Sequence, residues 1–143
     1  LGADMVISTV DSIIDGTFET KPQPEREFLP APKIFKETCK IEWNKPRECV
    51  RNLVRGLSPY PAAWTDICDA NDSVSTLKVF ETKLCDDLQS EQSLMPGDII
   101  CTKSRMAVMC ADGLLEILEL QLSGKKRMTT QAFLLGYKPK ACK

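Results

Sequence analysis

Residues 106–122 read MAVMCADGLLEILELQL, and this stretch decides the fold class. Asp112-Gly113 separates two apolar runs, residues 106–111 and residues 114–122. An Asp-Gly pair between such runs is typical of a β-hairpin, because a type I′ turn needs positive φ at both central residues. The stretch therefore predicts two antiparallel strands joined by a tight type I′ turn.

Strand-like patterns also lie on both sides of this hairpin. Upstream, residues 63–67, 77–84 and 98–103 are candidate strands, and Pro96-Gly97 is a turn before the third of them. Downstream, residues 129–135 predict a closing helix that Thr129 or Thr130 caps and Gly136 ends. Short strands with tight turns are typical of a small barrel or sandwich. On a regularly alternating strand Glu116 and Glu119 point to opposite faces, which excludes a paired-carboxylate site.

The first third of the chain has a different character. Residues 3–14 carry the apolar spacing of an amphipathic helix, which Asp15-Gly16 ends. Residues 17–33 are rich in proline and predict an extended linker. A second helix begins near Pro46 and runs to Gly56. We therefore expect a helix in residues 1–16, a linker in 17–45 and a barrel domain in 46–143. The first helix needs a partner for its apolar stripe: the barrel, a second copy in a dimer, or a catalytic domain that precedes it.

Composition excludes several classes of site. The 143 residues include no histidine, which removes Ser-His and Cys-His nucleophiles and HExxH zinc sites. The seven cysteines are odd in number and never stand at CxxC spacing, so we expect reduced thiols in a cytoplasmic protein, with Cys49, Cys101 and Cys110 in the core. The acidic residues near Asn71 lack the spacing of a calcium loop, and no metal site is expected. No apolar run approaches the ~18 residues of a membrane span. A start at Leu1 without a Met indicates a cut through a longer protein.

The charges are strongly separated along the chain although the net charge is -1. Residues 59–119 hold many more acidic than basic residues, whereas residues 120–143 hold only basic ones. The segment LSGKKRM at 122–128 presents three cations in a short loop, and such a loop can neutralise phosphates or can be an ordinary solvated surface. The arginines of the second helix carry the same two interpretations. Trp43 and Trp64 can stack on bases or pack in the core, and we favour the core.

Three segments resemble the C-terminal part of the methionyl-tRNA formyltransferase family. They are IEW at 41–43, VRNLVRGLSPYPAAWT at 50–65 and LELQLSGKKRM at 118–128. Residues 1–23 resemble the last helix of that family's catalytic domain and the exit into its linker. Other formyltransferases carry similar C-terminal domains, and the Gly-Lys-Lys-Arg-Met loop favours the tRNA enzyme.

The resemblance implies a mainly β fold with flanking helices: an OB-like small β-barrel of about five strands, preceded by an α-helix, an extended linker and a short helix. It implies a parent enzyme that transfers a formyl group from formyltetrahydrofolate to the amino group of methionyl-initiator-tRNA in translation initiation. The family's catalytic Asn, His and Asp lie outside this chain, so we expect no catalytic residue, no cofactor site and no activity in the chain alone. The expected role is tRNA docking. The candidate tRNA-binding residues of the linker, second helix and loop are Lys33, Lys36, Lys40, Arg51, Arg55, Lys125, Lys126 and Arg127.

Two other functions stay open at this point. The barrel could be a structural part of a different formyltransferase, or of a formyltetrahydrofolate hydrolase-like enzyme, that acts on a small molecule. It could also be a protein-interaction barrel whose acidic face meets a basic partner. The acidic surplus of residues 59–119 departs from the family pattern, so any RNA binding must rest on one face.

Overall fold

The chain forms two compact units in a computed structural model that describes residues 1–25, 30–88 and 93–142. The first unit is Leu1–Pro32 and the second is Lys33–Lys143. In the first unit, helix α1 (Gly2–Ile14) confirms the predicted helix, and Gly16 follows it with a φ of +67°. No residue of α1 is buried, and its apolar side chains, including Val6, Ile7 and Ile13, are exposed. Within the described residues, no helix is both long and apolar enough to cross a membrane.

The predicted linker, residues 17–45, is irregular in the described part of its first half, whereas its second half contains the short helix η1 (Glu37–Cys39) and the Lys40–Trp64 bridge. Residues 17–25 and 30–35 form neither helix nor strand, whereas residues 26–29 of the predicted linker lie outside the described residues. The alternating prolines account for this, because proline lacks the N–H that helices and sheets require.

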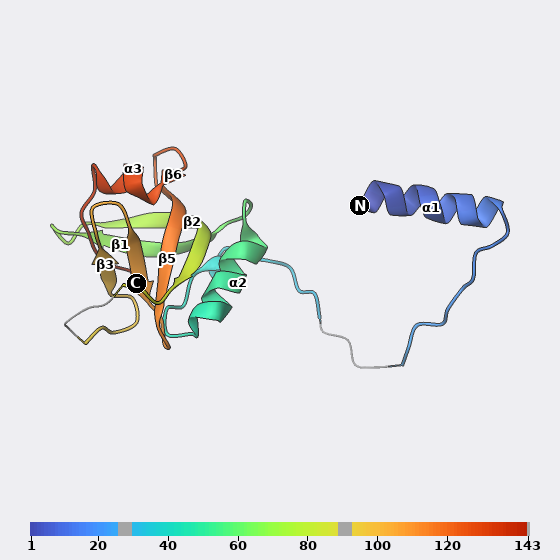
Figure 1. Ribbon diagram of the computed structural model, residues 1–143, viewed down its shortest axis with the longest axis horizontal. Helices are drawn as coiled ribbons and strands as arrows, with labels where there is room; N and C mark the ends of the chain where they lie inside the picture. The colour runs from blue at the N-terminus through green and yellow to red at the C-terminus, as the bar shows by residue number, and fades with distance from the viewer. Residues whose placement is uncertain (26–29, 89–92, 143) are drawn as a thin grey trace. The chain divides into compact units, whose positions relative to one another are not determined.

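The second unit is a curled antiparallel sheet with short helices around it (Figure 1). The strand order is β3-β4-β5-β2-β1-β7, and β6 pairs with β5. The strands are β1 (Ala63–Asp69), β2 (Val74–Cys85), β3 (Ile99–Cys101), β4 (Met106–Met109), β5 (Leu114–Leu122), β6 (Met128–Thr129) and β7 (Pro139–Cys142). The helices of this unit are η1 (Glu37–Cys39), α2 (Arg47–Leu57), which packs on β2, and α3 (Thr130–Leu134). The mainly β, barrel-like fold class is therefore confirmed.

Strand β7 brings the two edges of the sheet together. The backbone N–H of Cys142 donates to the carbonyl of Gly97 at 2.8 Å, and Asp98 and Ala141 form an antiparallel bridge. Gly97 has a φ of +97°, and a Cβ there would collide with the Cys142 carbonyl. The prediction of about five strands was too low, because β6 and β7 are short and β7 begins with a proline, which is uncommon inside a sheet.

The predicted hairpin forms, but its turn is not type I′. Strand β5 has the predicted bounds and pairs with β4. Asp112 does not have the positive φ that a type I′ turn requires. Its carboxylate instead accepts the backbone N–H of Arg47 at 2.7 Å, and the N–H of Cys110 donates to the Gly113 carbonyl at 2.9 Å. Asp112 thus satisfies a free N–H at the start of α2, where Pro46 offers no side-chain cap.

The core lies between the curled sheet and α2. Leu77, Leu115 and Leu120 are fully buried, and Val54 of α2 packs against them. Trp43 is also buried and donates its indole N–H to the Thr65 hydroxyl at 3.0 Å, which confirms the core interpretation for this tryptophan.

Strand β5 is irregular, and for that reason the prediction that Glu116 and Glu119 point to opposite faces was wrong. Ile117 and Leu120 are both buried although they are three residues apart, so Glu116 and Glu119 share the opposite face. The register with β2 shifts near Glu81 at this point.

All seven cysteines are free, but only one of the three expected core thiols, Cys110, is buried. Cys49 and Cys101 are exposed, because the buried stripe of α2 is narrower than the sequence indicated and β3 lies near the sheet edge.

Candidate nucleic-acid interface

Trp64 on β1 holds the end of the linker against the sheet. Its indole N–H donates to the carbonyl of Lys36 at 2.8 Å, and the ammonium groups of Lys36 and Lys40 lie 5.5 and 5.2 Å from its ring centre. Lys40 also pairs with Asp66 at 2.9 Å. A cation over an indole face is attracted by the ring's negative face. Trp64 is half-buried: it packs partly against the core and also contacts the end of the linker. The third linker cation, Lys33, lies 5.6 Å from the ring centre of Phe35.

The two candidate arginines of α2 line a hollow of about 360 Å³ beside β2. Arg51 pairs with Glu48 at 3.0 Å, and Arg55 donates to the Asn52 side chain at 3.0 Å. Phe80 of β2 lines the same hollow. The hollow is therefore basic along its helical wall, and Glu81 gives it one acidic neighbour.

The three loop cations do not have equal freedom. Arg127 lies over the Phe80 ring, 4.4 Å from its centre, and its guanidinium pairs with Glu119. Glu119 stands directly across from Glu81, so Arg127 offsets the repulsion between two carboxylates. Lys125 and Lys126 are exposed and form no ion pair with any described residue. The Gln121 side chain donates to the Lys125 carbonyl at 2.8 Å and steadies this part of the loop.

Two features connect the three groups of candidate cations: the side chain of Phe80, and a row of directly opposed residues on β1, β2 and β5. Arg51 and Arg55 line a hollow that Phe80 also lines, and Arg127 lies over the ring of Phe80. Trp64, which carries the linker cations, is directly across from Lys78, and Lys78 is directly across from Gln121. Lys78 was not among the candidate tRNA-binding residues predicted from the sequence. Its position between the buried residues Leu77 and Val79 was the available signal, because alternation places it on the outer face.

Three of the acidic residues pair with arginines that are not among the candidate cations. Arg105 makes paired hydrogen bonds to Glu116, at 2.7 and 2.7 Å, and to Asp87, at 2.7 and 3.0 Å. These bonds hold the pKa of both carboxyls below the ordinary range and raise the pKa of Arg105. Asp86 similarly pairs with Arg47 and raises its pKa.

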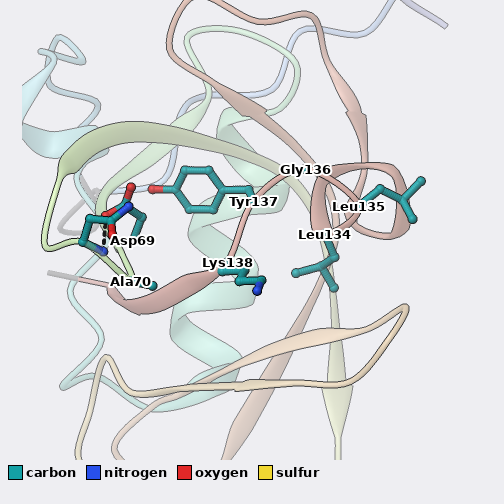
Figure 2. Close-up of a pocket in the computed structure, with 8 residues that line it drawn as sticks. Asp69, Ala70, Leu134, Leu135, Gly136, Tyr137 and Lys138 are labelled. Carbon is teal, nitrogen blue, oxygen red and sulfur yellow. Dashed lines mark hydrogen bonds between the residues drawn. The ribbon is translucent and has the colours of Figure 1, made fainter.

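A second hollow, of about 510 Å³, lies between the β1–β2 turn and the segment after α3 (Figure 2). Tyr137 reaches across it with its hydroxyl toward Asp69, and that hydroxyl is buried without a hydrogen-bond partner among the described residues. Burial, with a smaller contribution from Asp69, raises the pKa of Tyr137. This hollow contains none of the candidate cations, and its lining has one carboxylate, Asp69, and one ammonium group, Lys138. Within the described residues no group of acidic, cysteine or histidine side chains is arranged to hold a metal ion.

Comparison with known proteins gives a consistent family. Residues 33–138 match the model described as "Formyl transferase, C-terminal domain". Over 96% of its length the chain is 44% identical to a methionyl-tRNA formyltransferase of Phocaeicola vulgatus, and it is 42% and 37% identical to those of Parabacteroides distasonis and Porphyromonas gingivalis strain W83. It spans only 44%, 44% and 43% of those proteins.

Solved structures of HypX from Aquifex aeolicus share the fold. One of them, a variant with several substitutions, has a TM-score of 0.62 and 17% identity over 93% of this chain and 23% of HypX. Another, a complex with tetrahydrofolic acid, has a TM-score of 0.61 and 18% identity over 93% of this chain and 22% of HypX. At this identity the likeness concerns the fold alone. The match over residues 33–138, which is more than half of the chain, shows that the chain belongs to the formyl transferase C-terminal domain family.

Proposed function

We propose that this chain is the tRNA-docking part of a methionyl-tRNA formyltransferase. The whole enzyme would use formyltetrahydrofolate to formylate the amino group of methionyl-initiator-tRNA in the cytoplasm. A catalytic domain that precedes this chain would supply the chemistry and cover the apolar face of α1, and the donor is assigned to no residue of this chain. A second copy of the chain is the other candidate cover for α1.

The observation that carries the proposal is that cations from three separate segments lie against aromatic side chains of two paired strands, β1 and β2. Lys36 and Lys40 lie over Trp64, Arg51 and Arg55 line a hollow together with Phe80, and Arg127 lies over the ring of Phe80. Cations on one face can neutralise consecutive phosphates and release their counterions. Lys33, at the start of the same unit, extends the set along the linker.

Arg127 has a different part in the proposal from its two neighbours. Its contacts with Glu119 and Phe80 fix the base of the loop, whereas Lys125 and Lys126 are free to meet phosphates. Arg127 therefore contributes positive charge and also orients the loop.

Salt-dependent binding tests this function. The 143-residue chain should bind an initiator tRNA transcript with an affinity that falls steeply as the KCl concentration rises from about 50 to about 300 mM. The Lys125→Gln/Lys126→Gln pair should lower the slope of log K against log salt by about 1.4–1.8, since each phosphate contact contributes about 0.7–0.9. Lys103→Gln, on the β3–β4 connection, is the matched control and should leave the slope unchanged. A structural barrel from a small-molecule enzyme would show no such binding, and a protein-interaction barrel would be indifferent to the loop variant.

A further inference from the structure

We infer that the hollow between β2 and β5, with Lys78 as its cation, seats one phosphate of the RNA backbone; this rests on the proposed function. The hollow has a volume of about 240 Å³. Its lining has three polar side chains, one cation, one leucine and one glycine: Thr76, Gln121, Ser123, Lys78, Leu122 and Gly124.

The chemistry of the lining suits an anion. Each of the other four hollows described in the chain contains at least one Asp or Glu, and this one contains none. Lys78 is exposed and forms no ion pair with any described residue. The hydroxyls of Thr76 and Ser123 and the amide of Gln121 can donate to phosphate oxygens around that ammonium group.

Two carboxylates near this hollow have cationic partners, whereas Glu81, on the same strand as Lys78, forms no ion pair with any described residue. Asp66 stands across from Thr76 and pairs with Lys40 at 2.9 Å. Glu119 pairs with Arg127. A phosphate beside Lys78 would therefore meet the uncompensated charge of Glu81, whereas the charges of Asp66 and Glu119 are offset by their partners.

The position of the hollow connects two groups of cations that are far apart in the sequence. The Trp64, Lys78 and Gln121 row crosses three neighbouring strands. Adjacent strands lie about 4.8 Å apart, so the row spans roughly 10 Å. The linker cations on Trp64 stand at one end, and the Lys125 loop, which Gln121 holds, stands at the other. An RNA strand that ran across the strands would pass over Lys78 between them.

The experiment compares Lys78→Gln with Lys83→Gln in the 143-residue chain, with the same tRNA transcript and salt series. Lys83 is an exposed lysine of the same strand, but it stands across from Glu116. Lys78→Gln should lower the salt slope by about 0.7–0.9 and the affinity by about five- to eightfold at about 0.1 M KCl, as loss of one phosphate contact requires. Lys83→Gln should keep the wild-type slope and an affinity within about twofold. Circular dichroism and thermal melting of both variants serve as the control for folding, and both should match the wild type.

The outcomes separate the two proposals. If the wild-type chain shows no salt-dependent tRNA binding, the proposed function fails and the inference falls with it. If the Lys125→Gln/Lys126→Gln pair weakens binding but Lys78→Gln behaves like Lys83→Gln, only the phosphate seat is overturned. Ethylation interference gives a second readout: one tRNA phosphate should be sensitive with the wild type and insensitive with Lys78→Gln. An identical interference pattern for both proteins would also overturn the seat.

Discussion

Replacement of Glu116 by Gln tests the ion pair whose carboxylate is the least exposed among the described residues. The Glu116 side chain is 8% exposed and accepts two hydrogen bonds of 2.7 Å from Arg105. Gln removes the charge and turns one acceptor into a donor that faces the guanidinium group. Loss of one partner from a fully buried pair costs about 3–5 kcal/mol. Arg105 is 32% exposed and keeps Asp87, so we expect a smaller loss, about 2 kcal/mol in the free energy of unfolding at about pH 7.

The pH dependence of that loss has a definite sign. The pKa of Glu116 is lowered in the folded protein, so its contribution is complete above the ordinary glutamate pKa, about 4.3, and disappears as the pH falls through the lower folded value. Gln does not titrate there, so the difference between wild type and variant should narrow below about pH 4. Urea unfolding of the 143-residue chain from about pH 7 to about pH 3 measures both quantities. Glu119→Gln, at an exposed ion pair, is the control and should cost less than about 1 kcal/mol. A difference that stays constant with pH, or an equal loss in Glu119→Gln, would refute the charge argument.

Two further predictions concern the barrel seam and the linker. Gly97→Ala should destabilise the domain by about 1–3 kcal/mol, because the new Cβ meets the Cys142 carbonyl at a φ of +97°, and urea unfolding would show it; a neutral result would mean that the seam is looser than the structure indicates. Trp64→Phe removes the 2.8 Å hydrogen bond to Lys36 and weakens both cation contacts, so hydrogen exchange at residues 36–40 should accelerate about five- to thirtyfold, for a loss of roughly 1–2 kcal/mol. Exchange rates equal to the wild type would show that Trp64 does not hold the linker.

Much of the candidate site could be read from residue types alone. The cations of the 125–127 loop and of the linker were visible as local runs, and the arginines of α2 as a helical spacing. Lys78 was not visible as a member, because its alternation with Leu77 and Val79 shows only that it faces outward and not which residues lie beside it. Its significance comes from its cross-strand neighbours Trp64 and Gln121, which lie 14 and 43 residues away.

The sequence by itself determined helix α1, helix α2, strand β5 and the mainly β class, because helical and strand periodicities depend on residues only a few positions apart. The tertiary structure decided what depends on distant partners. Strand β7 is recognisable only through its pairing with β1 and its bond to Gly97, and Asp112 adopts a different turn, in which its carboxylate caps α2. Arg127 forms an ion pair with Glu119 and lies over Phe80 because β5 and β2 bring these two residues close to the loop. The same physical reason applies to β7, Asp112 and Arg127. Their contacts are with residues far away in the sequence, and the alternation of apolar and polar residues along a segment gives no information about such residues.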